Sequence, residues 1–338
     1  MYYVDFREEE SYNAIVLYAK RCIMDNLLQI RENERLSHVE TYNSNGLFEE
    51  GSWLHKPVKT VTDLLPYFRG KKNLRILDLG CGVGRNCIAF AKEYKSTGCT
   101  VDCVDLLSIA IEKLNRNAAT HGVTQCINGI VKAIEDYEIE ENRYDLIMSV
   151  SALEHIDSEE SFKDKLAQIS AGIRNGGIVC LVINSEVTEK DKATGEPMTA
   201  QFEVNMASEE LQRLLKETFS GWRIVKETLR KQQYDIPRGE KTADLTTNVV
   251  TFVAVKDEAE RCPYCGGEMK NGFVCTTVKS AVFWAEEKTS FFKGPAVLEG
   301  AEVLAKSTNP LNYVKGSNLP AAKCENCGRI ILENMQEK

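Results

Sequence analysis

The sequence lacks both a long apolar run and an excess of positive charge. No stretch approaches the roughly 18 consecutive apolar residues that a membrane-spanning helix needs. The 338 residues include 42 Lys and Arg against 50 Asp and Glu, which gives a net charge of -8 and an isoelectric point near 5.3. A chain of this charge presents no broad basic surface to nucleic acid. We therefore expect a soluble protein whose partners include neither a membrane nor nucleic acid.

An export signal is also missing. Residues Met1–Glu10 are acidic and aromatic, whereas a signal peptide has a basic start and an apolar core. We therefore predict a cytoplasmic protein, and disulfides are rare in the cytoplasm. The chain nevertheless has twelve cysteines. Eight lie mostly within apolar runs, and we expect them to pack as small buried hydrophobic side chains: Cys22, Cys81, Cys87, Cys99, Cys103, Cys126, Cys180 and Cys275.

The most informative stretch runs from Arg75 to Asn86. A short apolar run contains Asp78, three glycines follow at every second position, and an amphipathic segment begins at once. This order predicts a strand, a tight turn and a helix. The glycines at positions 80, 82 and 84 leave room for a ligand to lie against the backbone, and glycine accepts the positive φ angles of such turns. The stretch is typical of a loop that binds a nucleotide-type cofactor.

The glycine spacing excludes two common cofactor loops. A dinucleotide-binding loop has the pattern G-x-G-x-x-G, but Arg85 stands where its third glycine should be. A phosphate-binding loop needs Lys followed by Ser or Thr after its last glycine, and neither follows Gly84. A nicotinamide-dependent dehydrogenase is therefore disfavoured.

Strands and helices alternate from residue 73 to residue 255, which predicts an α/β fold with helices on both faces of a mostly parallel sheet. We expect seven strands, at residues 74–79, 100–104, 128–133, 144–150, 178–183, 222–229 and 249–255. Three parts are expected along the chain. Residues 1–70 form a helical extension, with helices at 8–33 and 59–68 around an irregular segment at 38–57. The extension is either a lid over the cofactor cleft or is simply anchored to the core by Phe48 and Trp53. Residues 71–256 form the α/β domain, and residues 257–338 form a small β-rich domain.

Ligands of open α/β sheets bind beyond the carboxyl ends of the strands. Asp105 ends the second predicted strand 21 residues after Gly84, where a carboxylate can accept hydrogen bonds from both hydroxyls of a ribose. The neighbouring candidates are Leu106 after that strand, Ile134 and Glu135 after the third strand, and Ser149, Val150 and Ser151 at the end of the fourth.

The string from Asp78 to Asn86 resembles motif I of the class I S-adenosylmethionine (SAM) methyltransferases, and Leu153-Glu154-His155 is similar to a tripeptide that recurs in them. Arg85 and Asn86 resemble more specifically the tellurite-resistance branch, which acts on small molecules. The resemblance covers residues 70–255. It implies a Rossmann-like, seven-stranded sheet whose last strand is antiparallel, and SAM as cofactor. It also implies that SAM is bound by Asp78, Gly80, Cys81, Gly82, Gly84, Arg85 and Asn86.

The resemblance leaves the methyl acceptor open. Members of the branch that act on chalcogen oxyanions use a histidine in the acceptor region, and this chain has none after His155. We expect a small-molecule acceptor of the thiol or another soft-nucleophile class. A thiolate needs no base, whereas an alcohol or amine would benefit from one, and His155 is the best-placed candidate. A structural role for His155 is the alternative, and Tyr234 and Glu203 are further candidates for the acceptor pocket.

Two C-x-x-C-G motifs lie at the start and near the end of the last predicted domain, at Cys262–Cys265 and Cys324–Cys327. Four thiolates suit a tetrahedral metal site, for which zinc is the first expectation and iron the competitor. A redox pair would not need the second motif. The region resembles a family of uncharacterised zinc-ribbon-like domains, and we expect zinc to hold a small β domain together.

This domain also leaves two alternatives for the whole chain. The ribbon could recruit a protein or RNA as methyl acceptor, or the chain could bind SAM without turnover and use the ribbon as an interaction surface.

Overall fold

We analysed a computed structural model of the chain, which describes residues 27–256, 262, 264–265, 267, 269–276, 281–286, 302–306 and 318–332. The chain divides into two compact units, Met1–Asp257 and Glu258–Lys338, and each is described here by itself. Most of the helix predicted at residues 8–33, and Cys22 within it, lies outside the described residues. Within the described ranges, no helix combines the length and the apolar character needed to cross a membrane.

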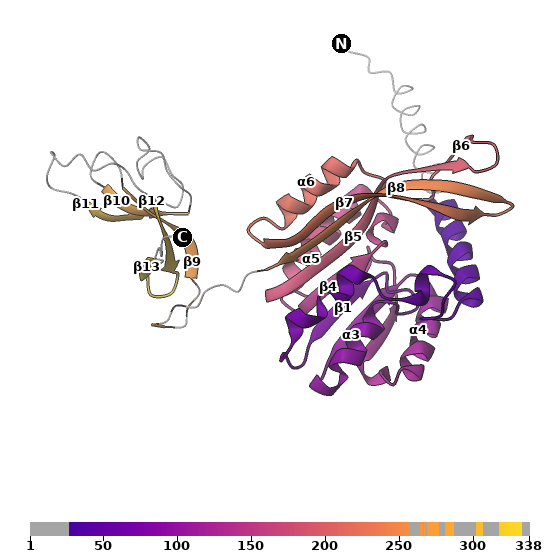
Figure 1. The fold of residues 1–338 in the computed structure, drawn as a ribbon. Helices are drawn as coiled ribbons and strands as arrows, with labels where there is room; N and C mark the ends of the chain where they lie inside the picture. The colour runs from indigo at the N-terminus through magenta and orange to yellow at the C-terminus, as the bar shows by residue number, and fades with distance from the viewer. Residues whose placement is uncertain are drawn as a thin grey trace, which may run out of the picture. The chain divides into compact units, whose positions relative to one another are not determined.

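The first unit is built on one mixed sheet (Figure 1), in the order β3-β2-β1-β4-β5-β8-β7. The first five strands are parallel, and β8 runs antiparallel to both of its neighbours. The prediction of an α/β sheet with an antiparallel last strand is confirmed. The strands are β1 (Arg75–Leu79), β2 (Thr100–Asp105), β3 (Ile127–Val131), β4 (Tyr144–Val150), β5 (Ile173–Asp191), β6 (Pro197–Met198), β7 (Arg223–Arg238) and β8 (Lys241–Val255).

The sheet has one strand more than predicted, because β6 pairs with the end of β5. A strand of two residues is too short to show any hydrophobic alternation. Three strands are also much longer than expected. Residues 184–191 of β5, 231–238 of β7 and 241–248 of β8 continue the pairing, and we call them the arm. Many of their residues are polar or charged, so the apolar pattern used to predict strands stops before the strands do.

Helices cover both faces of the sheet, as predicted. One apolar core lies between the sheet and the side chains of α2, η2, α3 and α4, and includes Phe68, Phe90 and Leu114. The other lies under α5 and α6 and includes Phe162 and Leu211. The helices are α2 (Lys59–Thr62), η2 (Leu65–Phe68), α3 (Cys87–Tyr94), α4 (Ser108–Thr120), α5 (Glu159–Gly172) and α6 (Ser208–Thr218).

The N-terminal extension differs from its prediction in two places. A helix spans residues 27–44, so the expectation of irregular chain from residue 38 was wrong for its first seven residues. Tyr42 is the one buried side chain among residues 38–44, so this stretch shows no apolar period. The single helix expected at 59–68 is two short ones, α2 and η2; Pro66 stands in the first turn of η2 and cannot donate a helical hydrogen bond to the turn before it.

Seven of the eight cysteines predicted to pack as hydrophobic side chains lie within the described residues, and all seven are buried. These thiols, six in the first unit and Cys275 in the second, therefore pack as core, which confirms the prediction for these positions.

The second unit contains a five-stranded antiparallel sheet in the order β11-β10-β9-β12-β13. Its described apolar clusters are small: one gathers Cys262, Met269, Ala322 and Cys324, and the other gathers Cys275, Phe283 and Ala285. The strands are β9 (Met269–Thr276), β10 (Ala281–Ala285), β11 (Glu302–Lys306), β12 (Asn318–Cys324) and β13 (Ile330–Leu332).

Candidate functional site

The glycine loop leaves β1 and is fastened to β2. The backbone amides of Gly80 and Cys81 both donate to the carbonyl of Val104, at 2.8 and 3.0 Å. Gly80 has a φ of +72°, and a Cβ atom there would lie only 2.1 Å from the Cβ of Ala152 after β4. Glycine is required here both for the backbone conformation and for the close approach of the β1 and β4 loops.

Asp105 lies against this loop at the end of β2. Its carboxylate accepts hydrogen bonds from the amides of Gly82, at 2.8 Å, and of Leu107, at 2.9 Å. Burial raises the pKa of Asp105, although the two amides favour its charged form. A carboxylate has about four lone-pair positions, so two remain for other donors. Leu106, beside it, is exposed. The arrangement predicted for ribose recognition is therefore geometrically available.

Asp78, near the end of β1, is buried, and its Oδ2 atom has no hydrogen-bond partner among the described residues. Burial raises the pKa of this carboxyl to about 7. An unpaired buried acceptor is costly unless a ligand or water pairs with it. Together with the backbone left open by the glycines and the spare capacity of Asp105, this unpaired acceptor suits a cofactor that carries hydroxyl and ammonium donors. SAM is such a cofactor, so the residues fit it.

Two residues predicted to contact the cofactor also hold the N-terminal extension. The Arg85 guanidinium lies 4.7 Å from the centre of the Trp53 ring and donates to the Trp53 carbonyl at 3.0 Å. The side-chain oxygen of Asn86 accepts from the amide of Val58 at 3.1 Å. Both side chains therefore fasten residues 53–58 to the loop.

The residues predicted at the end of β4 point in different directions. Ser149 is fully buried and donates its hydroxyl to the carbonyl of Leu79 at 3.0 Å, which ties β4 to β1. Val150 is also buried. Ser151 is exposed, has a φ of +52°, and is the member of this group whose side chain is accessible to a ligand. Cys81 is buried, and burial raises the pKa of its thiol, so it contributes to the loop through its backbone.

The helix at residues 27–44, which is part of the N-terminal extension, forms a wall of the site. Tyr42 is 4% exposed, and its hydroxyl lies 2.9 Å from where a Cβ of Gly82 would be. Its carbonyl accepts from the ammonium of Lys113 on α4, at 2.6 Å. The available signal was a row of polar residues spaced three or four apart along the helix, at positions 31, 34, 38 and 42.

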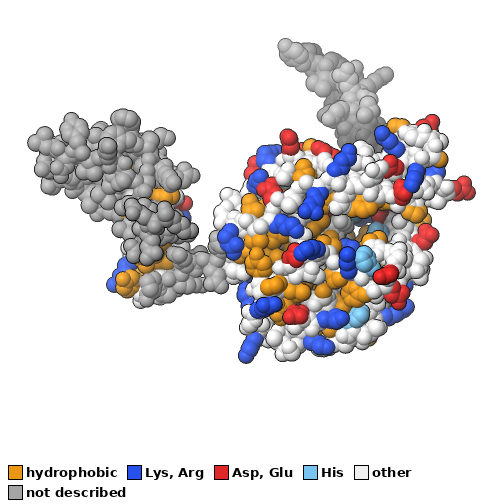
Figure 2. Space-filling view, viewed as in Figure 1, with side chains coloured by type: hydrophobic (Ala, Val, Ile, Leu, Met, Phe, Trp, Pro, Cys, Tyr) orange, Lys and Arg blue, Asp and Glu red, His pale blue; other side chains and the backbone are white. Residues whose placement is uncertain are grey.

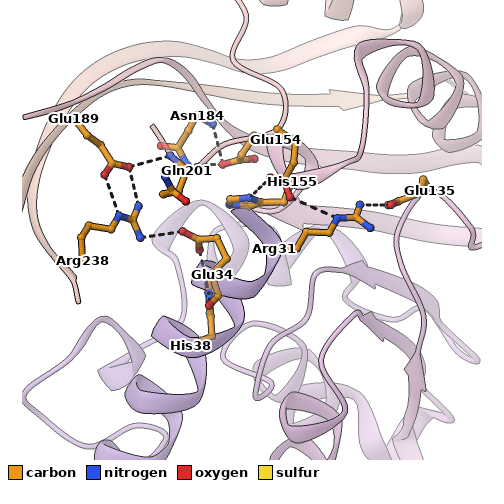
Figure 3. A network of polar contacts seen from close by, with 11 residues as sticks. Arg31, Glu34, His38, Glu135, Glu154, His155, Asn184, Glu189, Gln201 and Arg238 are labelled. Carbon is orange, nitrogen blue, oxygen red and sulfur yellow. Dashed lines mark hydrogen bonds and ion pairs between the residues drawn. The ribbon is translucent and has the colours of Figure 1, made fainter. Parts of the chain in front are cut away.

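Figure 3 shows where this helix meets the loops that follow β3 and β4, around His155. Arg31 pairs with Glu135, which follows β3, and its Nε lies 3.6 Å from the carboxylate of Glu203. The other Glu203 oxygen lies 2.9 Å from Nδ1 of His155, and the ring of Phe202 stacks on the imidazole with centroids 4.9 Å apart. The helix, the β3 loop, the β4 loop and the segment before α6 therefore meet through side chains.

A second set of contacts joins the helix to the arm (Figure 3). Arg238, near the tip of β7, makes two hydrogen bonds to Glu189 of β5, at 2.9 and 2.7 Å. The same guanidinium bonds to Glu34 at 3.1 Å. Glu189 is fully buried in this pair. The Arg238 guanidinium therefore bridges Glu189 of the arm and Glu34 of the helix, and none of the three side chains is more than 19% exposed.

His155 lies among carboxylates. Burial alone would lower its pKa, but the hydrogen bond to Glu203 and the nearby charges of Glu34 and Glu154 outweigh burial and raise the pKa to about 9. Glu154 is itself fully buried and accepts from the backbone and side-chain amides of Asn184. The imidazole is therefore a much stronger base than an ordinary histidine.

The remaining predicted residues lie at the edges of this network. Ile134 is largely buried in the core under α5, beside Glu135. Tyr234 lies on the arm and is 46% exposed; burial raises its pKa, and the positive charge of Arg85 opposes the rise. On the face drawn in Figure 2, Lys and Arg are scattered among Asp and Glu rather than gathered in one patch.

The four cysteines of the two C-x-x-C-G motifs converge in the second unit. We call each motif a knuckle. Their sulfur atoms all lie within 4.8 Å of one another, with 3.7 Å between Cys262 and Cys327 and 3.5 Å between Cys265 and Cys324. A tetrahedral zinc with Zn–S bonds of about 2.3 Å would place its sulfurs about 3.8 Å apart. The cysteine cluster therefore fits zinc, and iron in the same geometry fits equally.

The two knuckles are built alike. The amide of Cys262 donates to the carbonyl of Gly267, and the amide of Cys324 donates to that of Arg329, both at 2.8 Å. The Arg329 guanidinium lies 4.2 Å from the centre of the Tyr264 ring, so the knuckles also contact each other directly.

Comparison with known proteins shows which families two segments of the chain match. Residues 76–177 match the methyltransferase domain family. The first unit therefore contains a methyltransferase domain, and the match includes the glycine loop, Asp105 and His155. Residues 262–336 match a family described as a domain of unknown function, DUF6487.

Individual relatives are distant. Ajmaline N-methyltransferase of Rauvolfia serpentina is 25% identical over 103 residues, which are 30% of this chain and 34% of that protein. The chain thus matches about a third of the length of the curated relative. TehB of Haemophilus influenzae is 20% identical and covers 58% of this chain and 62% of its own, with a TM-score of 0.44. YcgJ of Bacillus subtilis is 12% identical and covers 59% and 98%, with a TM-score of 0.43.

Proposed function

We propose that the protein is a SAM-dependent methyltransferase that acts on a small-molecule acceptor. The observation that carries this proposal is the methyltransferase-family match over residues 76–177, within which the glycine loop and Asp105 lie in direct contact. Bound SAM would supply an electrophilic methyl group on a sulfonium. Asp105 would accept hydrogen bonds from the ribose hydroxyls, and Asp78 would accept one from a donor of the cofactor.

The small-molecule class is supported by the construction of the site. The helix at 27–44 and the arm meet over the strand ends through buried ion pairs, and the side chains of Glu189 and Glu203 are at most 2% exposed. The curated relative is named as an N-methyltransferase of ajmaline. A site bordered by such buried ion pairs suits a compact acceptor better than a polymer.

For the second unit, we propose that one zinc ion binds the four knuckle cysteines and stabilises its small β-sheet. The proposal is supported by the sulfur-to-sulfur distances and by the small size of the described apolar clusters. A thiol acceptor, a protein partner of this unit and a cytoplasmic location stay predictions.

Isothermal titration calorimetry with SAM and, separately, with NADH tests the cofactor. We expect SAM to bind and NADH not to bind. Asp105→Ala removes the ribose acceptor and should weaken SAM binding at least tenfold, whereas Asp63→Ala, which removes a surface carboxylate paired with Lys59, should leave it unchanged. A folded protein that binds no SAM would overturn the proposed function.

A further inference from the structure

The Glu203–His155 pair has the geometry of a buried, oriented base. Nδ1 of His155 is engaged by a carboxylate that is 2% exposed, and Phe202 fixes the plane of the ring. The imidazole itself is 26% exposed, and no hydrogen bond to Nε2 is found among the described residues. If Nδ1 donates to Glu203, Nε2 is the nitrogen that can accept a proton from a ligand.

We propose that His155 takes the proton that an amine acceptor loses on methylation, and that Glu203 is its positioning residue. This inference rests on the proposed methyltransferase function and names its acceptor class. The acceptor nitrogen forms a bond to the methyl carbon, and the electron pair of the broken carbon–sulfur bond stays on the cofactor sulfur. One N–H proton passes to Nε2, so atoms and charge balance.

The charges around the ring favour an amine over a thiolate. Three carboxylates face His155: Glu34 from the helix, Glu154 from its own loop, and Glu203 from the segment before α6. Arg31 is the nearby cation, and it is shared between Glu203 and Glu135. These carboxylates stabilise an imidazolium and attract an ammonium, and they repel an anionic sulfur.

The wider network of ion pairs also has more negative than positive groups. The ion pairs drawn in Figure 3 bring Arg31 and Arg238 together with Glu34, Glu135 and Glu189. Adding Glu154 and Glu203 gives five carboxylates against two guanidinium groups and His155. Alkyl and α-amino groups have ordinary pKa values of about 8 to 10.4, so a base that titrates near pH 9 is matched to them.

The first experiment measures the pKa of His155 by NMR, with its resonance assigned from His155→Asn. We expect a value raised to about 9 in the unaltered protein, because Glu203 bonds to Nδ1 and the charges of Glu34 and Glu154 lie nearby. Glu203→Gln removes the bonded carboxylate and should lower the value by about two units, toward the ordinary 6.5. Glu34→Gln, which leaves the Nδ1 contact in place, should lower it by less. Glu227→Gln, a carboxylate paired with Lys216 elsewhere in the unit, is the matched control and should not move it.

The second experiment measures SAM-dependent methylation of a panel of primary and secondary amines and thiols from pH 6 to 10. For amines, kcat/KM should rise with pH and reach half of its maximum near pH 9, because Nε2 must be unprotonated to act as base. In Glu203→Gln the rise should shift to lower pH together with the NMR value. His155→Asn should lower kcat by about 10²- to 10⁴-fold, with SAM affinity by calorimetry unchanged.

Three results would overturn the inference while leaving SAM binding intact: turnover of thiols but not amines, a fall in kcat/KM above pH 9, or a pH profile that Glu203→Gln does not shift. Failure to bind SAM would instead overturn the proposed function, on which the inference rests.

Discussion

The two units of this chain are stabilised in different ways. The first encloses two large apolar clusters, one on each face of its sheet, and each cluster has more than twenty buried members. The described part of the second unit has two clusters of four and three buried residues, and two of those residues are knuckle cysteines. A small sheet buries too little apolar surface to offset the entropy of folding. The first unit is therefore held by packing, and we expect the second to need a bound ion.

Cysteine shows the same contrast within one residue type. In the first unit, the described cysteines are buried, and burial raises the pKa of thiols such as Cys99 and Cys180 to about 12. They remain protonated and behave as small hydrophobic side chains. In the second unit, four sulfurs converge on one point. The two groups of cysteines differ in their spacing along the chain. The converging cysteines occur as C-x-x-C pairs, and each pair brings two thiols close together.

The largest effect we predict is on removal of the metal. Metal analysis of the purified protein should find one zinc per chain. Chelation, or Cys324→Ser, should unfold the second unit, because binding of structural zinc supplies on the order of 10 kcal/mol of folding free energy. Calorimetry should show that the transition of the first unit stays in place.

Cys275→Ala provides the control for that experiment. Cys275 is fully buried in the other small cluster of the unit and is not one of the four converging thiols. The variant should keep its zinc while losing some stability. Full retention of the second unit's fold after metal removal would contradict the contrast between a packed unit and a metal-held unit.

A smaller effect is expected at the tightest contact of the first unit. Gly80→Ala places a methyl group 2.1 Å from the Cβ of Ala152, at a φ of +72°. We expect a loss of roughly 2–5 kcal/mol from the left-handed strain and the clash together, with weakened SAM binding. Gly122→Ala has a φ of +63° but its nearest neighbour is 4.0 Å away, so it should cost only about 1–2 kcal/mol. Thermal unfolding measures both losses. If the two variants lose equal free energy of unfolding, the close approach of the β1 and β4 loops at Gly80 adds nothing to the cost of the left-handed backbone.

Two groups of residues in the site differ in how far the sequence could predict them. The residues proposed to bind the cofactor lie close together in the sequence: Asp78 and the glycines fall within seven residues, and the position of Asp105 follows from the length of one helix and strand. The network around His155 joins residues 31, 135, 155 and 203, which come from four separate segments of the chain. No single-sequence pattern pairs Arg31 with Glu203, because that pairing depends on how the helix packs on the strand ends. The arm was missed for a related reason, since backbone pairing with β8 orders polar residues that show no apolar alternation.

The smallest effect is expected at Arg85, which the motif resemblance assigns to the cofactor. In the structure its guanidinium lies over the Trp53 ring and bonds to the Trp53 carbonyl. Arg85→Ala should therefore loosen residues 53–58 by about 1–2 kcal/mol, measured as faster amide hydrogen exchange in that segment. Lys92→Ala, an exposed cation on α3, the helix that follows Arg85, is the control. If SAM affinity falls while exchange at 53–58 stays slow, Arg85 contacts the cofactor directly; if exchange alone rises, the extension is stabilised by the loop it covers.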